Sequence, residues 1–114
     1  MTAIGDWIEF VMSEEAVAIP TKIRIRNGNG SAAIKVISLL VGNGDGSWHK
    51  LVDDVTDIQK SDENEQEFVF GELLVTPQWI RKNNAKYIRM EVRQNHGDEE
   101  DNMFCGFRLF GVVL

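Results

Sequence analysis

The sequence predicts an all-β protein built as a β-sandwich or jelly roll, and three observations lead to this prediction. Short apolar segments recur along the chain, and several alternate apolar with polar residues, which is the period of a half-buried strand. Turn residues, mainly glycine and asparagine, separate these segments. Little of the chain has a helical pattern, so we expect sheets to cover each other rather than to be covered by helices.

The first three strands are expected before residue 42. Residues 6–12 (DWIEFVM) form an apolar segment, and Pro20 favours an extended connection to the next strand. Residues 21–26 (TKIRIR) alternate isoleucine with lysine or arginine, so one face is expected in the core and the other in water. The Asn-Gly-Asn-Gly run at 27–30 tolerates positive φ and predicts a tight hairpin. Residues 33–41 form the most apolar segment, which indicates a central strand.

The middle of the chain is more polar. Residues 42–46 (GNGDG) predict a second reversal, which leads into a short strand at 48–51. Residues 53–67 are mostly acids, amides and lysine, so we interpret them as a long surface connection. Residues 68–76 resume strand character, and residues 77–84 begin with a proline that is allowed at the first position of a helical turn.

Two further strands are expected at residues 87–93 and 103–114, with a polar loop between them. Loops on a rigid sheet are common positions for binding groups. At the start of this loop, Asn95 and His96 offer an amide and an imidazole for hydrogen bonding, and the carboxylate of Asp101 is placed to orient the ring. The alternative is that Asn95 and His96 cap the strand and bond to loop main chain.

Composition limits the classes of function. The 114 residues are expected to form one domain, residues 1–114, with a real core, because 43% of them are hydrophobic. The net charge of −6 opposes binding to nucleic acid. No apolar run approaches the roughly 20 residues that cross a membrane. The single cysteine, Cys105, excludes an internal disulfide and favours an intracellular, reducing compartment. We find no metal-ligand spacing, cofactor motif or catalytic motif, and expect no enzyme.

Residues 20–29 (PTKIRIRNGN) and 92–96 (VRQNH) resemble two segments of DOC domains, the family typified by the subunit of the anaphase-promoting complex that helps to recognise degradation signals. Residues 20–29 (PTKIRIRNGN) resemble the P-S-K-I-S-V-R-x-G-N stretch of that family. Residues 92–96 (VRQNH), with Asp101 five residues after the histidine and FRLF at 107–110, are similar to its A-N-H-x-x-G-x-D-T-H motif and last strand. Residues 7–10 (WIEF), 22–25 (KIRI), 45–48 (DGSW) and 85–89 (AKYIR) look like segments of the galactose-binding-like superfold, to which DOC domains belong.

The resemblance implies a galactose-binding-like jelly roll that recognises a protein or peptide segment without catalysis, in a ubiquitin-ligase context and within a larger assembly. It implies a binding site formed by two neighbouring loops. The residues expected to line it are Asn95, His96, Asp101, Asn27, Gly28 and Asn29.

Two alternatives remain open. The first is a carbohydrate-binding module, in which Trp48 or Trp79 stacks on a sugar ring. The second is a structural docking or oligomerisation domain, because Asn-His-Gly followed later by Phe-Arg-Leu-Phe-Gly also resembles the end of SUN domains. The basic stripe of Lys22, Arg24 and Arg26 is expected to pair with carboxylates across strands rather than to bind an acidic ligand.

Overall fold

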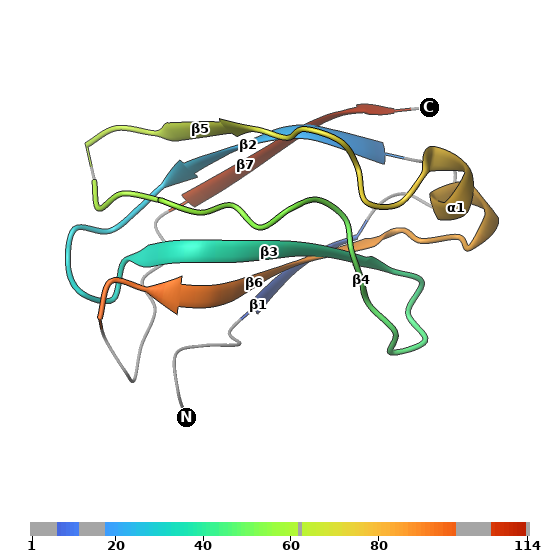
Figure 1. Ribbon diagram of the computed structural model, residues 1–114, viewed down its shortest axis with the longest axis horizontal. Helices are drawn as coiled ribbons and strands as arrows, with labels where there is room; N and C mark the ends of the chain where they lie inside the picture. The colour runs from blue at the N-terminus through green and yellow to red at the C-terminus, as the bar shows by residue number, and fades with distance from the viewer. Residues whose placement is uncertain (1–6, 12–17, 62, 98–105, 114) are drawn as a thin grey trace.

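The computed structural model describes residues 7–11, 18–61, 63–97 and 106–113. They form two antiparallel sheets that lie one above the other, which confirms the predicted all-β class (Figure 1). The strand order is β1-β6-β3-β4 in one sheet and β5-β2-β7 in the other. The elements are β1 (Trp7–Val11), β2 (Ala18–Arg26), β3 (Ile34–Gly42), β4 (His49–Lys50), β5 (Gln66–Val69), α1 (Pro77–Lys82), β6 (Tyr87–Asn95) and β7 (Gly106–Val113).

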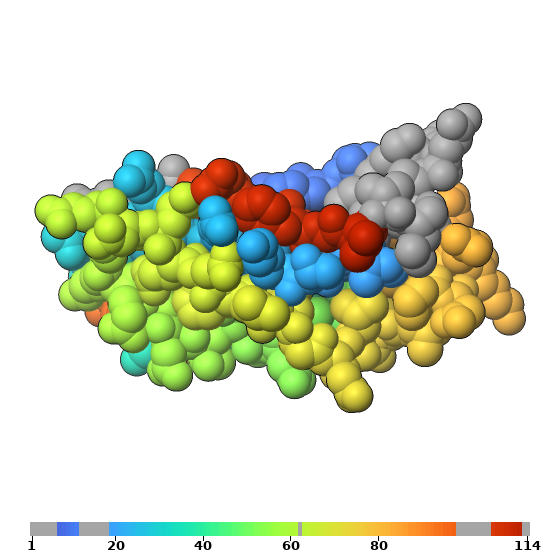
Figure 2. Space-filling model, turned by 90° about the horizontal axis from the view of Figure 1, so that it is seen from above, coloured from blue at the N-terminus to red at the C-terminus, as the bar shows by residue number. Residues whose placement is uncertain are grey.

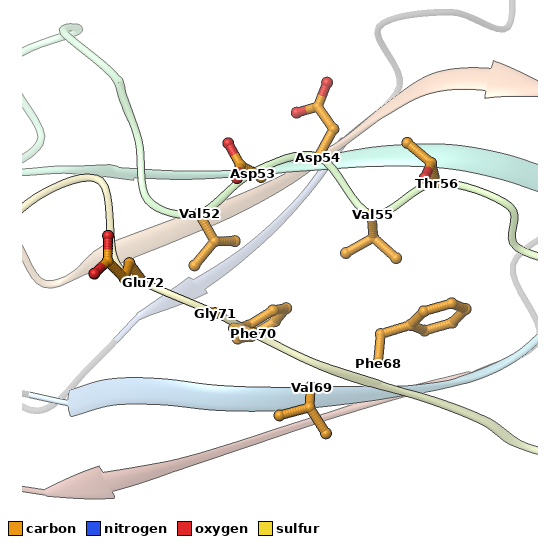
Figure 3. Close-up of a pocket in the computed structure, with 10 residues that line it drawn as sticks. All are labelled: Val52, Asp53, Asp54, Val55, Thr56, Phe68, Val69, Phe70, Gly71 and Glu72. Atoms are coloured by element: carbon orange, nitrogen blue, oxygen red, sulfur yellow. The ribbon is translucent and has the colours of Figure 1, made fainter.

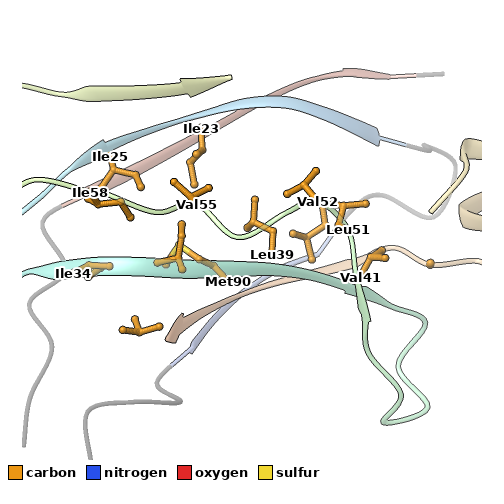
Figure 4. Packing of buried hydrophobic residues seen from close by; sticks show 14 of the residues in the cluster. Ile23, Ile25, Ile34, Leu39, Val41, Leu51, Val52, Val55, Ile58 and Met90 are labelled. Atoms are coloured by element: carbon orange, nitrogen blue, oxygen red, sulfur yellow. The ribbon is translucent and has the colours of Figure 1, made fainter. Parts of the chain in front are cut away.

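The core lies between the inner faces of the two sheets (Figure 4). The isoleucines of β2, Ile23 and Ile25, have no exposed surface, and they face Leu39 of β3 and Met90 of β6, which are also fully buried. Burial of each such side chain stabilises the fold by about 1.5–3 kcal/mol. The alternation predicted for residues 21–26 is therefore confirmed.

The predicted hairpin at residues 27–30 is wrong. β2 and β3 belong to different sheets, so the segment between them carries the chain across the sandwich. The positive-φ residues of the described chain do not include Gly28 or Gly30. The physical reason is that the apolar side chains of β2 and β3 face each other across the core, and a hairpin would place them side by side in one layer.

The second reversal agrees with the sequence prediction. β3 and β4 pair antiparallel, with Leu40 opposite Lys50. Gly44 and Gly46 between them have φ of 93° and 94°. Glycine reaches this conformation at little steric cost, which explains its use at both positions.

Residues 53–67 do more than connect strands. Val55 exchanges two main-chain hydrogen bonds with Ile37, of 3.0 and 2.9 Å, so this segment lies along the same edge of β3 that pairs with β4. β5 then begins at Gln66, inside the predicted loop, and ends at Val69 instead of continuing to residue 76. The prediction failed because the buried Val55 and Ile58 are isolated in a polar sequence, although they anchor the segment to the core.

The helical turn is confirmed as α1. The hydroxyl of Thr76 accepts a hydrogen bond from the N–H of Trp79 at 3.0 Å and caps its start, and Pro77 occupies the first turn. Among the described residues, no helix is long and apolar enough to cross a membrane.

Candidate functional site

The structure brings three of the expected site residues, Asn27, Asn95 and His96, together at one end of the sandwich. There β6 ends and the crossing segment between β2 and β3 begins (Figure 1). Ala33 and Ile34 lie at their centre. Ile34 pairs with Asn95 between β3 and β6, and its main chain both donates a hydrogen bond to the side chain of Asn27 and accepts one from it. The carbonyl of Ala33, the preceding residue, accepts a hydrogen bond from the N–H of His96 at 2.9 Å.

The side chain of Asn27 is 1% exposed, and all of its hydrogen-bonding capacity is used inside the protein. Its Nδ2 donates to the carbonyl oxygens of Ile34 at 2.7 Å and Gln59 at 2.9 Å. Its Oδ1 accepts from the N–H groups of Gly28 at 2.8 Å and Ile34 at 3.0 Å. The amide therefore joins three segments of the chain and has no group left for a ligand.

His96 is similarly engaged. Its Nε2 lies 2.8 Å from the carbonyl oxygen of Ile58. A carbonyl only accepts, so Nε2 carries the proton and Nδ1 is the ring nitrogen that remains for other contacts. The Oδ1 of Asn95 accepts the N–H of Gly97 at 3.0 Å, which is the strand-capping role considered for it from the sequence.

The other expected residues differ in position. Gly28 is buried and its carbonyl accepts the N–H of Ser61 at 3.1 Å, whereas Asn29 is exposed. Asp101 lies outside the described residues. At this end of the sandwich the polar groups mainly hold the loops to one another, and Asn29 is the exposed residue among the described ones that were expected to line the site.

The aromatic residues considered for sugar stacking already contact other side chains. The guanidinium carbon of Arg89 lies 4.1 Å from the ring centroid of Trp7 and 4.3 Å from that of Trp48. Trp79 meets the ring of His49 nearly edge-on, with 4.7 Å between centroids. Both candidates, Trp48 and Trp79, thus also take part in contacts within the protein.

The basic stripe of β2 lies on the outer face of the three-stranded sheet, which Figure 2 shows from above. Glu67 of β5 pairs with Lys22 at 3.1 Å and with Arg24 at 2.8 Å. Lys22, Arg24 and Arg108 also lie 5.0 to 5.7 Å from the ring centroid of Phe110. The expected cross-strand pairing is thus present, and these cations are largely balanced locally.

A cleft lies along the side of the sandwich, between β5 with the residues after it and the segment that follows β4 (Figure 3). Its volume is about 230 Å³. Small-molecule sites usually occupy roughly 300–1,000 Å³, so this space suits one or two side chains better than a cofactor. Its walls are lined by Val52, Asp53, Asp54, Val55, Thr56, Phe68, Val69, Phe70, Gly71 and Glu72.

Two sets of hydrogen bonds, which we call clasps, lie at the two ends of this cleft and hold its walls together. At one end, the side chain of Gln66 accepts from the N–H of Gln59 at 2.8 Å and donates to the carbonyl of Gln59 at 2.7 Å. At the other end, the N–H of Leu74 donates to the carbonyl of Leu51 at 2.8 Å. Between the clasps, Val52 and Val55 point toward Phe68 and Phe70, which gives the cleft an apolar floor (Figure 3).

The carboxylates at the rim have different surroundings. Asp54 turns to the outer face of the four-stranded sheet, where it accepts a 2.6 Å hydrogen bond from Ser38 and pairs with Lys50 at 3.1 Å. Burial raises the pKa of Asp54, but these bonds and the charges of Lys50 and Arg93 outweigh burial and hold that pKa below its usual value.

Asp53 and Glu72 are both exposed. No hydrogen bond or ion pair of either carboxylate with another described residue is present. The cleft therefore combines an apolar floor with two carboxylates that are unpaired among the described residues.

The sequence contains one signal for this cleft that the prediction of a surface connection at residues 53–67 did not use. Val52, Val55 and Ile58 recur at every third position of an otherwise polar segment, and all three are buried. Regularly spaced apolar residues in a polar segment indicate that one side of the segment contacts a core.

Within the described ranges, no cluster of three or more histidine, cysteine, aspartate or glutamate side chains is arranged to hold a metal ion. Comparison with protein-family models, curated proteins and solved structures finds no match to this chain.

Proposed function

We propose that this protein is a non-catalytic binding module that recognises an extended segment of another protein. The main support for this proposal is the cleft between Gln66 and Leu74, which has an apolar floor. Its rim carries the carboxylates of Asp53 and Glu72, which are unpaired among the described residues. A segment with an apolar residue for the floor and a lysine or arginine beside it complements both features. The small volume of the cleft, about 230 Å³, implies weak binding by the isolated protein, in the micromolar range or above.

We further propose that the fold is a jelly roll of the galactose-binding-like superfold. The nested order of strand pairs supports it: β2 pairs with β7 in one sheet, and the next pair inward, β3 with β6, lies in the other sheet. The ubiquitin-ligase context and an intracellular location are part of this proposal. They are supported by the DOC-like residues 20–29 and 92–96 and by the single cysteine.

The test is a selection of peptides from a random peptide library displayed on phage, with the immobilised protein as bait. Enriched peptides are synthesised, and their affinity is measured by fluorescence polarisation. We expect enrichment of apolar residues flanked by lysine or arginine, and an affinity loss of about tenfold or more for Glu72→Lys. Glu63→Lys is the matched control, because Glu63 is also exposed but lies outside the cleft.

Two outcomes contradict the proposal. Failure to enrich any peptide argues against a segment-binding module. Peptides whose affinity is unchanged by Glu72→Lys but lost in Asn95→Ala/His96→Ala, at an unchanged melting temperature, place the site at the loop end instead. A glycan-binding measurement with no peptide enrichment would favour the carbohydrate alternative.

A further inference from the structure

The edge of β5 that faces away from β2 exposes main-chain hydrogen-bonding groups beside the cleft. The N–H of Phe70 donates to the carbonyl of Thr21 at 2.9 Å, which fixes the phase of the ladder between these strands. In an antiparallel pair, successive residues direct their main-chain groups alternately toward and away from the partner. The groups of Phe68 therefore point toward β2, and those of Glu67 and Val69 point away from it.

The side chains of β5 alternate in the same way. Phe68 points into the cleft and packs against the core, whereas Val69 points outward and is 73% exposed. A strand added beside β5 would place every second side chain over the apolar floor and the others in solvent. The edge is short, because β5 spans four residues between the framing clasps.

We propose that the bound segment adds an antiparallel strand to the free edge of β5. This inference rests on the proposed function and specifies its chemistry. The main-chain groups of Glu67 and Val69 hydrogen-bond to the segment, alternate apolar side chains of the segment cover Val55 and Phe68, and a terminal lysine or arginine pairs with Glu72. The ligand class is an extended, apolar-alternating peptide that is recognised mainly through its main chain.

The probe is the acetylated and amidated peptide Lys-Thr-Val-Thr-Val-Thr-Lys, which alternates valine with threonine between basic ends. Its binding is followed by NMR on isotopically labelled protein. At saturation, amide hydrogen exchange at Glu67 and Val69 is expected to slow by about tenfold or more. Exchange at Phe68 and Phe70 is expected to change little, because their N–H groups already bond to β2.

Two series of N-methylated probes test the strand pairing directly. The threonines of the bound peptide are expected to lie opposite Glu67 and Val69, so their N–H groups point toward β5. N-methylation of a threonine should therefore weaken binding by about tenfold, and N-methylation of a valine should leave it nearly unchanged.

The matched protein variants are Val69→Pro and Val69→Thr. Proline removes an N–H that faces away from β2, which an edge strand tolerates, and the side chain it replaces is exposed. Both variants should keep the melting temperature, and Val69→Pro should lose far more peptide affinity than Val69→Thr, which keeps the main-chain N–H.

Peptide binding that is lost in Glu72→Lys but unchanged in Val69→Pro, with no exchange protection at Glu67 and Val69, overturns strand addition and leaves the proposed function standing. Equal effects of the two N-methylated series also overturn it. Failure of this probe to bind, while peptides selected from the library do bind at the cleft, overturns the assigned ligand class.

Discussion

Replacement of Asn27 by alanine tests whether the most buried of the expected site residues serves the fold. The change removes four hydrogen bonds to main-chain groups of Gly28, Ile34 and Gln59. We expect a large loss of stability and an unchanged peptide affinity of the protein that remains folded.

The magnitude follows from what the substitution leaves behind. The N–H groups of Gly28 and Ile34 are buried, and each loses its acceptor at a cost of about 1–3 kcal/mol. The two carbonyl oxygens lose a donor and add less. The free energy of unfolding should thus fall by about 3–4 kcal/mol, out of the ~5–15 kcal/mol typical of a domain. The melting temperature should fall by roughly 10–15 °C.

The assay is urea unfolding followed by tryptophan fluorescence, with Asn29→Ala as the control. Asn29 is exposed, so its replacement should change the free energy of unfolding by no more than about 0.5 kcal/mol. Asn27→Asp tests the acceptor and donor roles of the amide separately. The carboxylate can still accept from the N–H groups, but it cannot donate to the carbonyl oxygens of Ile34 and Gln59. A cost below about 1 kcal/mol for Asn27→Ala, together with lost peptide binding, would refute the structural role.

Two further predictions concern strand packing and pH. A side chain at Gly111 would collide with the main-chain oxygen of Ile19 at the bulge of β2, so Gly111→Ala should cost about 1–3 kcal/mol in thermal unfolding. Gly106→Ala in the same strand meets open space and should be nearly neutral; similar losses for both would contradict the packing argument. The lowered pKa of Asp54 means that its stabilising contribution is present above the ordinary aspartate pKa of about 3.9 and is lost as the pH falls through the lower folded-state pKa. Acid titration of stability should therefore be steeper for the native protein than for Asp54→Asn, and parallel curves would contradict the assignment.

Local sequence patterns predicted where strands form, whereas the strand that each one pairs with depends on residues far away in the sequence. The alternation at residues 21–26 is set by which side chains enter the core, so the sequence predicts it directly. The pairing of β2 with β7 instead of β3 depends on the apolar faces of the whole sandwich and on the side chain of Asn27, which bonds to Ile34 and Gln59. Such long-range contacts have no local signature.

The candidate site follows the same division. Sequence similarity drew attention to Asn95 and His96, and the structure brings both beside Asn27, where they bond to loop main chain. The cleft could not be predicted from the sequence, because its walls come from two segments that are polar overall. These segments are joined only by tertiary contacts, such as those between Gln59 and Gln66. No single stretch of sequence carries both walls.

The pairing of β2 with β7 also has a consequence for how the chain acquires its structure. Ile23 lies opposite Leu109, about 86 residues later in the sequence, so the three-stranded sheet cannot close until residue 109 has been synthesised. Folding dominated by such non-local pairing is slow, on the order of milliseconds to seconds. Until β7 arrives, the edge of β2 and its isoleucines are exposed, which favours incorrect pairing and aggregation of the incomplete chain.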